Sequence, residues 1–311
     1  MSTPASQRRA GLWIAAVAAI LFSAKAIIAK LMYGHGVDAV TLIALRMLMA
    51  GPIFAVIALI ETRRARLRGD HLSRADIARI VVLGLLGYYL SSFLDFWGLQ
   101  YVSASLERLI LFLNPTLVLL IGVLFLHQRV SRAQLFALAL SYLGIVLVFV
   151  ENLSSEGSQV AKGSLLVFLA ALSYALYLLL SGELVARVGS LRLVAYAMCV
   201  STLACLIQFF ALRAPATLLQ PAPVLWLSAL NALFATVLPV YLTMVAISRV
   251  GAAATSQMAV IGPVSLVFFG WWILDEKITP LQLLGTSIVL CGVMVLARAN
   301  KRQLRDELAG D

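Results

Sequence analysis

The chain alternates between long apolar stretches and short polar connections. Ten stretches of about 20 residues hold few charges, and a helix of that length crosses the roughly 30 Å hydrocarbon core of a bilayer. The pattern predicts an all-α integral membrane protein with ten spans, at residues 11–30, 39–60, 79–99, 103–126, 132–150, 163–182, 190–212, 223–247, 251–274 and 279–298. Because several connections are only a few residues long, neighbouring helices are predicted to be antiparallel, with no soluble domain between them.

The composition supports a membrane protein. Hydrophobic residues make up 62% of the chain and charged residues 12%, and the mean hydropathy of +0.99 is far above that of soluble domains. The net charge of +10 does not indicate nucleic-acid binding, because the Lys and Arg residues lie in short loops and are not gathered with aromatic residues on one solvated face. The first apolar stretch, with Ala24-Lys25-Ala26, is similar to a secretory signal peptide. We interpret it as a retained helix, because its loss would leave nine spans and break the repeat described below.

Loop charges predict the orientation of the chain. With a cytoplasmic N-terminus, the inner loops and tails carry 17 Lys and Arg residues and the outer loops carry four, which are Lys30, Lys162, Arg213 and Lys277. Positive residues accumulate on the cytoplasmic side of membrane proteins. Both termini are therefore predicted to be cytoplasmic.

The two halves of the chain are weakly similar to each other. A shift of 148 residues aligns, without a gap, Pro115 with Pro263, Gly122 with Gly270, Gln134 with Gln282 and Gly144 with Gly292. Each half holds five predicted spans, and because five is odd the second half crosses the membrane upside down relative to the first. We therefore predict two inverted five-helix repeats, residues 1–152 and 153–311. Such repeats are typical of secondary transporters with a solute site near the midplane.

Both halves share a short hairpin, a span with a central proline, a polar triplet and a glycine-containing span. The first copy reads FWGLQYVSASLERLILFLNPTLVLLIGVLFLHQRVSRAQLFALALSYLG and the second MVAISRVGAAATSQMAVIGPVSLVFFGWWILDEKITPLQLLGTSIVLCG. This pattern resembles the EamA-like family of the drug/metabolite transporter (DMT) superfamily over nearly all ten spans. The resemblance implies a bacterial inner membrane, metabolites such as amino acids as frequent cargo, and often export. The chain departs from the family in the first triplet, where Gln128 replaces the acidic residue present as Glu276 in the second.

Five ionisable residues lie well inside predicted spans, away from the span ends, and all are in the first half: Lys25, Arg46, Asp95, Glu107 and Arg108. A central charge costs roughly 2.5 to 3.5 kcal/mol on insertion scales, so five unpaired charges would cost on the order of 15 kcal/mol. One interpretation is a water-accessible cavity where they bind a polar or zwitterionic solute and where a carboxylate carries a proton. The other is that Glu107 and Arg108 reach the outer surface and pair with Asp95 or Arg46. We favour the cavity for the cluster as a whole.

Two prolines occupy equivalent positions in the halves. Asn114 and Pro115 follow Glu107 by two helical turns, so they are expected to share its helix face. Proline leaves a carbonyl near Leu111 without its helical partner. Either Pro115 or Pro263 alone would indicate a structural kink, whereas the pair favours hinges or a backbone that faces the solute.

Aromatic side chains are expected to complete the cavity. Tyr174 and Tyr177 lie on one face of the sixth span, with Tyr241 of the eighth span opposite them. Because most such residues simply pack between helices, each is a candidate only. Glu183 and Arg187, four residues apart, are predicted to form an ordinary helix pair.

These features favour a secondary active transporter of small polar metabolites over an enzyme. The chain has no G-x-x-x-x-G-K-[ST] loop for ATP, and the three histidines, His35, His71 and His127, lie in separate loops. The three cysteines have no metal-ligand spacing. We expect no cofactor or metal. A membrane enzyme and a channel are the less favoured classes, because neither catalytic residues nor a repeated filter sequence is visible.

The charges also bear on the cargo and the assembly. Three cations against two carboxylates suit a zwitterion or an anion better than the lipophilic cationic drugs that are the alternative cargo. Because each chain supplies both halves of the site, a monomer is predicted to suffice, with the solute and the lipid bilayer as its partners.

Overall fold

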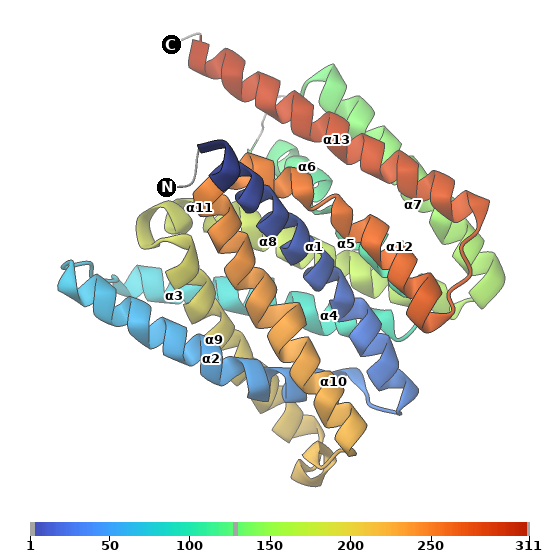
Figure 1. The fold of residues 1–311 in the computed structure, drawn as a ribbon, viewed down its shortest axis with the longest axis horizontal. Coiled ribbons are helices and arrows are strands. Elements are labelled where there is room, and N and C mark those ends of the chain that lie inside the picture. The colour runs from blue at the N-terminus through green and yellow to red at the C-terminus, as the bar shows by residue number, and fades with distance from the viewer. Residues whose placement is uncertain (1–3, 127–129, 310–311) are drawn as a thin grey trace.

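The computed structural model describes residues 4–126 and 130–309, and the regular elements in these ranges are all helices (Figure 1). In chain order they are α1 (Pro4–Gly34), α2 (Ala39–Leu67), α3 (Arg74–Gly84), η1 (Leu85–Leu90), α4 (Ser91–Leu99), α5 (Ala104–Leu111), α6 (Asn114–Leu126), α7 (Arg132–Glu156), α8 (Gln159–Val188), α9 (Ser190–Leu212), η2 (Pro215–Leu218), α10 (Ala222–Ala232), η3 (Leu233–Val237), α11 (Leu238–Met258), α12 (Ile261–Leu274) and α13 (Pro280–Ala309).

The helices have the lengths and surfaces of a multi-pass membrane protein. Within the described ranges, nine helical stretches are at least 18 residues long and apolar enough to cross a membrane. The apolar helix α12 is shorter, with 14 residues. Trp13, Leu124 and Trp272 are between 63% and 73% exposed, as expected of apolar side chains that face lipid.

The predicted ninth span, residues 251–274, is not one continuous helix. Gly251 adopts a left-handed φ of 82° inside α11, and α11 ends at Met258 before α12 begins at Ile261. The predicted fourth span is interrupted in the same way, between α5 and α6. The two interruptions are separated by close to the 148 residues that align the halves.

The prolines near these interruptions begin helices and do not kink them. Pro115 is the second residue of α6 and Pro263 the third of α12, where the first amide groups have no helical partner and proline costs little. The carbonyl of Leu111 accepts a hydrogen bond from Nδ2 of Asn114 at 2.6 Å. Because the helix ends at Leu111, the expected common face of Glu107 and Asn114 does not form.

Helices of one half pack against helices of the other throughout the bundle. α1 contacts α11 and α12, α4 contacts α8, and α2 contacts α9, while α7 and α13 lie side by side at one edge (Figure 1). A Cβ atom at Gly98 would lie 2.7 Å from the carbonyl oxygen of Gly163, and one at Gly144 would lie 2.6 Å from that of Gly285. These glycines let the helix backbones touch.

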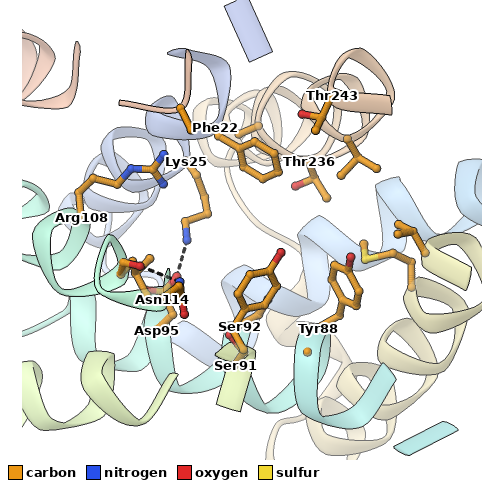
Figure 2. A pocket seen from close by; sticks show the side chains of 18 of the residues that line it. Phe22, Lys25, Tyr88, Ser91, Ser92, Asp95, Arg108, Asn114, Thr236 and Thr243 are labelled. Atoms are coloured by element: carbon orange, nitrogen blue, oxygen red, sulfur yellow. Dashed lines mark hydrogen bonds and ion pairs between the residues drawn. The ribbon is translucent and has the colours of Figure 1, made fainter. Parts of the chain in front are cut away.

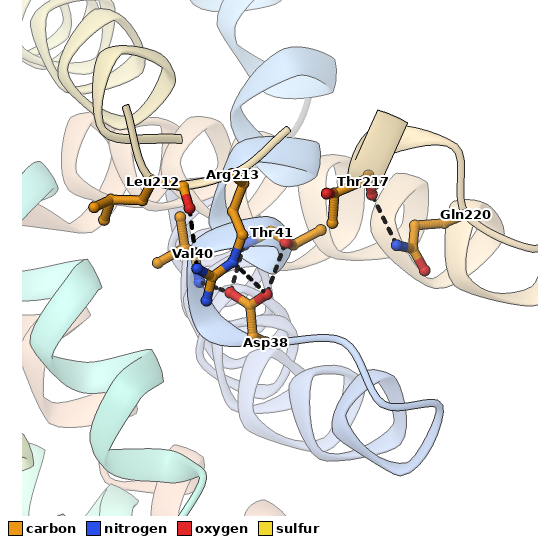
Figure 3. A network of polar contacts seen from close by, with 7 residues as sticks. All are labelled: Asp38, Val40, Thr41, Leu212, Arg213, Thr217 and Gln220. Carbon is orange, nitrogen blue, oxygen red and sulfur yellow. Dashed lines mark hydrogen bonds and ion pairs between the residues drawn. The ribbon is translucent and has the colours of Figure 1, made fainter. Parts of the chain in front are cut away.

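The connection before α2 fixes the start of the helix that carries Arg46. Oδ1 of Asp38 accepts hydrogen bonds from the amides of Val40 and Thr41 at 2.9 and 3.1 Å (Figure 3). Oδ2 accepts one from Nε of Arg213, in the connection after α9, at 3.1 Å. Burial raises the pKa of Asp38, but the hydrogen bonds from Thr41 and Arg213 outweigh it, so this pKa lies below its usual value.

The predicted pair within α8 is wrong. Arg187 pairs with Asp76, and Glu183 pairs with Arg79 at 3.4 Å. Both side chains therefore connect the end of α8 to α3, because the two helices approach each other there.

Candidate functional site

A cavity of about 430 Å³ lies inside the bundle and is lined by both halves of the chain (Figure 2). This volume is in the range of small-molecule sites. The first half contributes most of the polar lining, including Lys25, Arg46, Ser92, Asp95, Arg108 and Asn114. The second half contributes Tyr174, Thr236 and Thr243 among mostly apolar residues.

Three charged side chains meet at one side of the cavity. Nζ of Lys25, on α1, donates a hydrogen bond to Oδ2 of Asp95, on α4 (Figure 2). The same Nζ lies 3.4 Å from Oε1 of Glu107, on α5. Asp95 lines the cavity, whereas Glu107 is completely buried behind it. Glu107 therefore does not reach the outer surface, and its ion-pair partner is Lys25, which neither sequence interpretation included.

Arg46 brings a guanidinium group to the cavity from α2. Its side chain is 5% exposed and lies over the ring of Phe96, at 4.8 Å from the centroid. Nη2 donates a hydrogen bond to Oγ of Ser92 at 3.2 Å. Nε has no hydrogen-bond partner, and no carboxylate in the described part of the chain forms a salt bridge with Arg46. An arginine has five N–H donors, and one hydrogen bond leaves most of those of Arg46 without a partner in the described part of the chain.

Arg108 presents a second guanidinium group from α5. Its Nη2 lies against the backbone of α12 at Gly262. A Cβ atom at that glycine would be only 2.7 Å from this nitrogen. Its Nε is buried without a hydrogen-bond partner among the described residues, and Arg108 forms no salt bridge with them. The cavity thus combines two unpaired guanidinium groups with an ammonium group that already has two carboxylates.

The start of α5 is held by the second half. Glu276, in the loop between α12 and α13, accepts hydrogen bonds from the amide of Ala104 at 2.7 Å and from the hydroxyl of Ser105 at 2.8 Å. The acidic residue of the second triplet therefore positions the helix that carries Glu107 and Arg108. The first triplet, with Gln128, lies outside the described residues.

The candidate tyrosines have three different environments. Tyr174 lines the cavity. Tyr177 is 4% exposed and packs behind it, with its ring 5.2 Å from that of Tyr88 and the two hydroxyls 3.2 Å apart. Tyr241 is 55% exposed on α11, so it points away from the cavity and its expected position opposite Tyr174 is wrong.

Of the two hinge candidates, only Pro115 lines the cavity. Pro263 is buried inside α12.

Two π-helical turns, which the sequence did not indicate, contribute residues to the lining. The turn η1 supplies Gly87 and Tyr88, and the turn η3 supplies Ala235 and Thr236. Oγ1 of Thr236 donates to a carbonyl five residues earlier, at 2.9 Å. Such turns are common at functional sites, but hydrophobic periodicity does not reveal them. The described residues hold no group of three or more His, Cys, Asp and Glu side chains able to bind a metal.

Known proteins resemble the chain over most of its length. The model of the EamA-like transporter family matches residues 9–150 and 161–298. The uncharacterized transporter YcbK of Bacillus subtilis is 29% identical, over 86% of this chain and 86% of its own. A solved crystal structure covers 95% of this chain and 99% of its own, with a TM-score of 0.61 and 16% identity, which shows a common fold alone.

Two relatives carry names that state a cargo. A probable terminal-alkyne amino-acid exporter of Streptantibioticus cattleyicolor is 26% identical, over 88% of each chain. An S-adenosylmethionine/S-adenosylhomocysteine transporter of Chlamydia trachomatis is 28% identical, over 83% of this chain and 80% of its own. Because the family model covers both halves, the chain belongs to the EamA-like transporter family.

Proposed function

We propose that the chain is a secondary transporter that exports small amino-acid-like metabolites by alternating access between two inverted repeats. One observation carries the proposal: Arg46 and Arg108 present guanidinium groups to the cavity without a salt-bridge partner in the described part of the chain.

The charges of the cluster favour a ligand with a carboxylate. When all five groups are ionised, Lys25, Arg46 and Arg108 exceed Asp95 and Glu107 by one positive charge. A carboxylate would balance it, and guanidinium groups bind carboxylates through paired N–H donors. Among the described residues, no amine, amide or hydroxyl group donates a hydrogen bond to Oδ1 of Asp95, and an ammonium group of the same ligand would supply one.

The named relatives support this class of cargo. Amino acids, S-adenosylmethionine and S-adenosylhomocysteine all carry an α-ammonium and an α-carboxylate group. These are the two groups for which the cavity offers partners. We therefore propose the α-amino-carboxylate class, with Tyr174 and Asn114 as further contacts.

Matching features of the two halves support the inverted repeat, with a boundary near residues 152 and 153. The π-helical turns begin 148 residues apart, at Leu85 and Leu233. Gly144 and Gly292 are also 148 residues apart, and a Cβ atom at either would lie within 3.0 Å of a carbonyl oxygen across the α7–α13 contact. Rocking of two such halves would open the central cavity to each side in turn.

The remaining parts of the proposal follow from the sequence. Both termini would lie in the cytoplasm of a bacterial cell, with the chain in the inner membrane. One chain holds both halves, so a monomer would suffice. Transport would be coupled to an ion gradient, with Asp95 and Glu107 as candidate proton carriers, or driven by the gradient of the solute.

Counterflow in proteoliposomes tests the proposal. Labelled amino acids, small organic acids and lipophilic cations are offered to the wild type, Arg46→Gln, Arg108→Gln and Arg64→Gln. Arg64 is the control, because its side chain is 63% exposed and pairs with Glu61 on the same helix. We expect saturable exchange of amino acids that both cavity variants lose and the control keeps.

Two other outcomes would contradict the proposal. Exchange of lipophilic cations that is unaffected by both cavity variants would replace amino acids with drugs as the cargo. No exchange of any solute would remove the transport function proposed for this cavity.

A further inference from the structure

Lys25 stands between two carboxylates that differ in their access to the cavity. Its Nζ hydrogen bonds Oδ2 of Asp95, which lines the cavity, and lies 3.4 Å from Oε1 of Glu107, which does not. Asp95 is 3% exposed and Glu107 is 0% exposed. The lysine therefore ties α1 to α4 and has a second anionic position within reach on α5.

The carboxylates offer more acceptors than the lysine uses. Among the described residues, no amine, amide or hydroxyl group donates a hydrogen bond to Oδ1 of Asp95 or to either oxygen of Glu107. An ammonium group prefers about 2.7 to 2.9 Å to a carboxylate oxygen. Lys25 would thus need to move by only about half an ångström to hydrogen bond Glu107, which its flexible four-carbon stem allows.

We propose that Lys25 is a tethered competitor for the ammonium group of the transported solute. In the empty cavity the ammonium group of Lys25 is hydrogen bonded to the carboxylate of Asp95. An arriving solute places its own ammonium on Asp95, and Lys25 shifts to Glu107. This inference rests on the proposed function, because it requires a solute with an ammonium group.

Charge balance explains why both carboxylates are needed. When both carboxyl groups are ionised, Asp95, Glu107 and Lys25 together carry a net charge of minus one. The solute ammonium supplies the missing cation, so each carboxylate then has one partner. In this exchange the side chain of Lys25, on α1, loses its contact with α4 and gains one with α5. Solute binding therefore changes which helices Lys25 connects, and this links binding to helix movement.

The test uses two probes that each keep one charged group of leucine. Isopentylamine keeps the ammonium and 4-methylpentanoate keeps the carboxylate. Their binding to the full-length protein in nanodiscs is measured by calorimetry, with empty nanodiscs as the blank. The key variant, Lys25→Met/Glu107→Gln, removes one charge of each sign and leaves Asp95 free.

We expect this double variant to bind isopentylamine at least tenfold more tightly than the wild type, with 4-methylpentanoate unchanged. Adding Asp95→Asn should abolish the gain. The single variant Glu107→Gln should have the opposite effect and weaken isopentylamine several-fold, because the displaced lysine then has no second carboxylate.

The outcomes separate this inference from the proposed function. Isopentylamine affinity that is equal or lower in the double variant, or unchanged in Glu107→Gln, overturns the role of Lys25. If the double variant does not fold, as judged by its elution and melting profiles, Glu107→Gln alone decides. Two other results would instead contradict carboxylate recognition in the proposed function. One is that the wild type does not bind 4-methylpentanoate, and the other is that Arg46→Gln binds it as tightly as the wild type.

Discussion

Arg46 is expected to serve ligand binding at no benefit to the stability of the empty protein. A buried arginine that stabilises a fold has its donors paired with carboxylates or carbonyls. Arg46 has one hydrogen bond, to Ser92 at 3.2 Å, and the face of Phe96 at 4.8 Å. We predict that Arg46→Met, which keeps most of the side-chain volume, separates binding from stability.

The magnitudes of the two effects differ. Removing the guanidinium forfeits a charge-assisted hydrogen bond worth about 1.5 kcal/mol and a ring contact worth about 1 kcal/mol, and it relieves a burial cost of roughly 2.5 to 3.5 kcal/mol. The free energy of unfolding should therefore stay the same or rise by about 1 kcal/mol. A ligand carboxylate loses a charge-assisted contact of about 1.5 to 3 kcal/mol, which weakens binding roughly 10- to 150-fold.

Two measurements on one preparation check this prediction. Thermal unfolding of the empty protein in detergent reports stability, and calorimetric titration with leucine reports the dissociation constant. Arg64→Met, on the exposed part of α2, is the matched control and should change neither. A melting temperature that falls by several degrees in Arg46→Met would falsify the argument, because Arg46 would then be a structural residue.

Three further predictions concern residues around the site. Glu276→Ala should lower the free energy of unfolding by about 1.5 to 3 kcal/mol, because the start of α5 loses charge-assisted hydrogen bonds. Glu276→Gln should recover part of this loss, and equal melting temperatures of the wild type and both variants would contradict the prediction. Gly98→Ala should destabilise the protein by about 1 to 3 kcal/mol, because its Cβ would lie 2.7 Å from the backbone of α8. The control Gly182→Ala, whose Cβ would have no atom within 4 Å, should be neutral or stabilising. Similar shifts in melting temperature for the two variants would count against a close contact between α4 and α8. Asp38→Asn should cost up to about 1 kcal/mol at pH 7, since both side chains of its ion pair are partly exposed to solvent. The folded pKa of Asp38 is lowered from 3.8, so this difference should be complete above pH 3.8 and be lost as pH falls from 3.8 through the lower folded pKa. A difference that does not shrink at all below pH 3.8 would exclude the charge as its source.

Several site residues could be predicted from the sequence because charge inside an apolar span is costly. Lys25, Arg46, Asp95 and Arg108 interrupt stretches that otherwise suit lipid, and all four line the cavity. The partner of Glu107 could not be predicted in the same way. Which ammonium reaches a buried carboxylate depends on where α1 crosses α5, and spacing along one helix contains no information about that crossing.

The errors have a common physical origin. In a membrane protein both the lipid-facing and the core-facing sides of a helix are apolar, so hydrophobic periodicity does not orient it. The sequence therefore predicts that Tyr241 faces the cavity, although this residue is 55% exposed. For the same reason residues 251–274 are apolar enough for one span, while the left-handed φ of Gly251 and the start of α12 at Ile261 divide them.

The uneven distribution of charge across the cavity has a mechanistic consequence. The four charged residues that line the cavity come from the first half, as does Glu107 behind them, while the second half faces them with Tyr174, Thr236, Thr243 and apolar side chains. If a solute is held by its charged groups, it is anchored to one half, and its side chain lies against the other. Movement of the second half across the solute would then open and close the cavity without breaking the ionic contacts. Breaking them would be costly, because the charged groups would have to be desolvated again at each step. In a transporter of this kind, the first half would recognise the charged end of the solute and the second would discriminate among side chains.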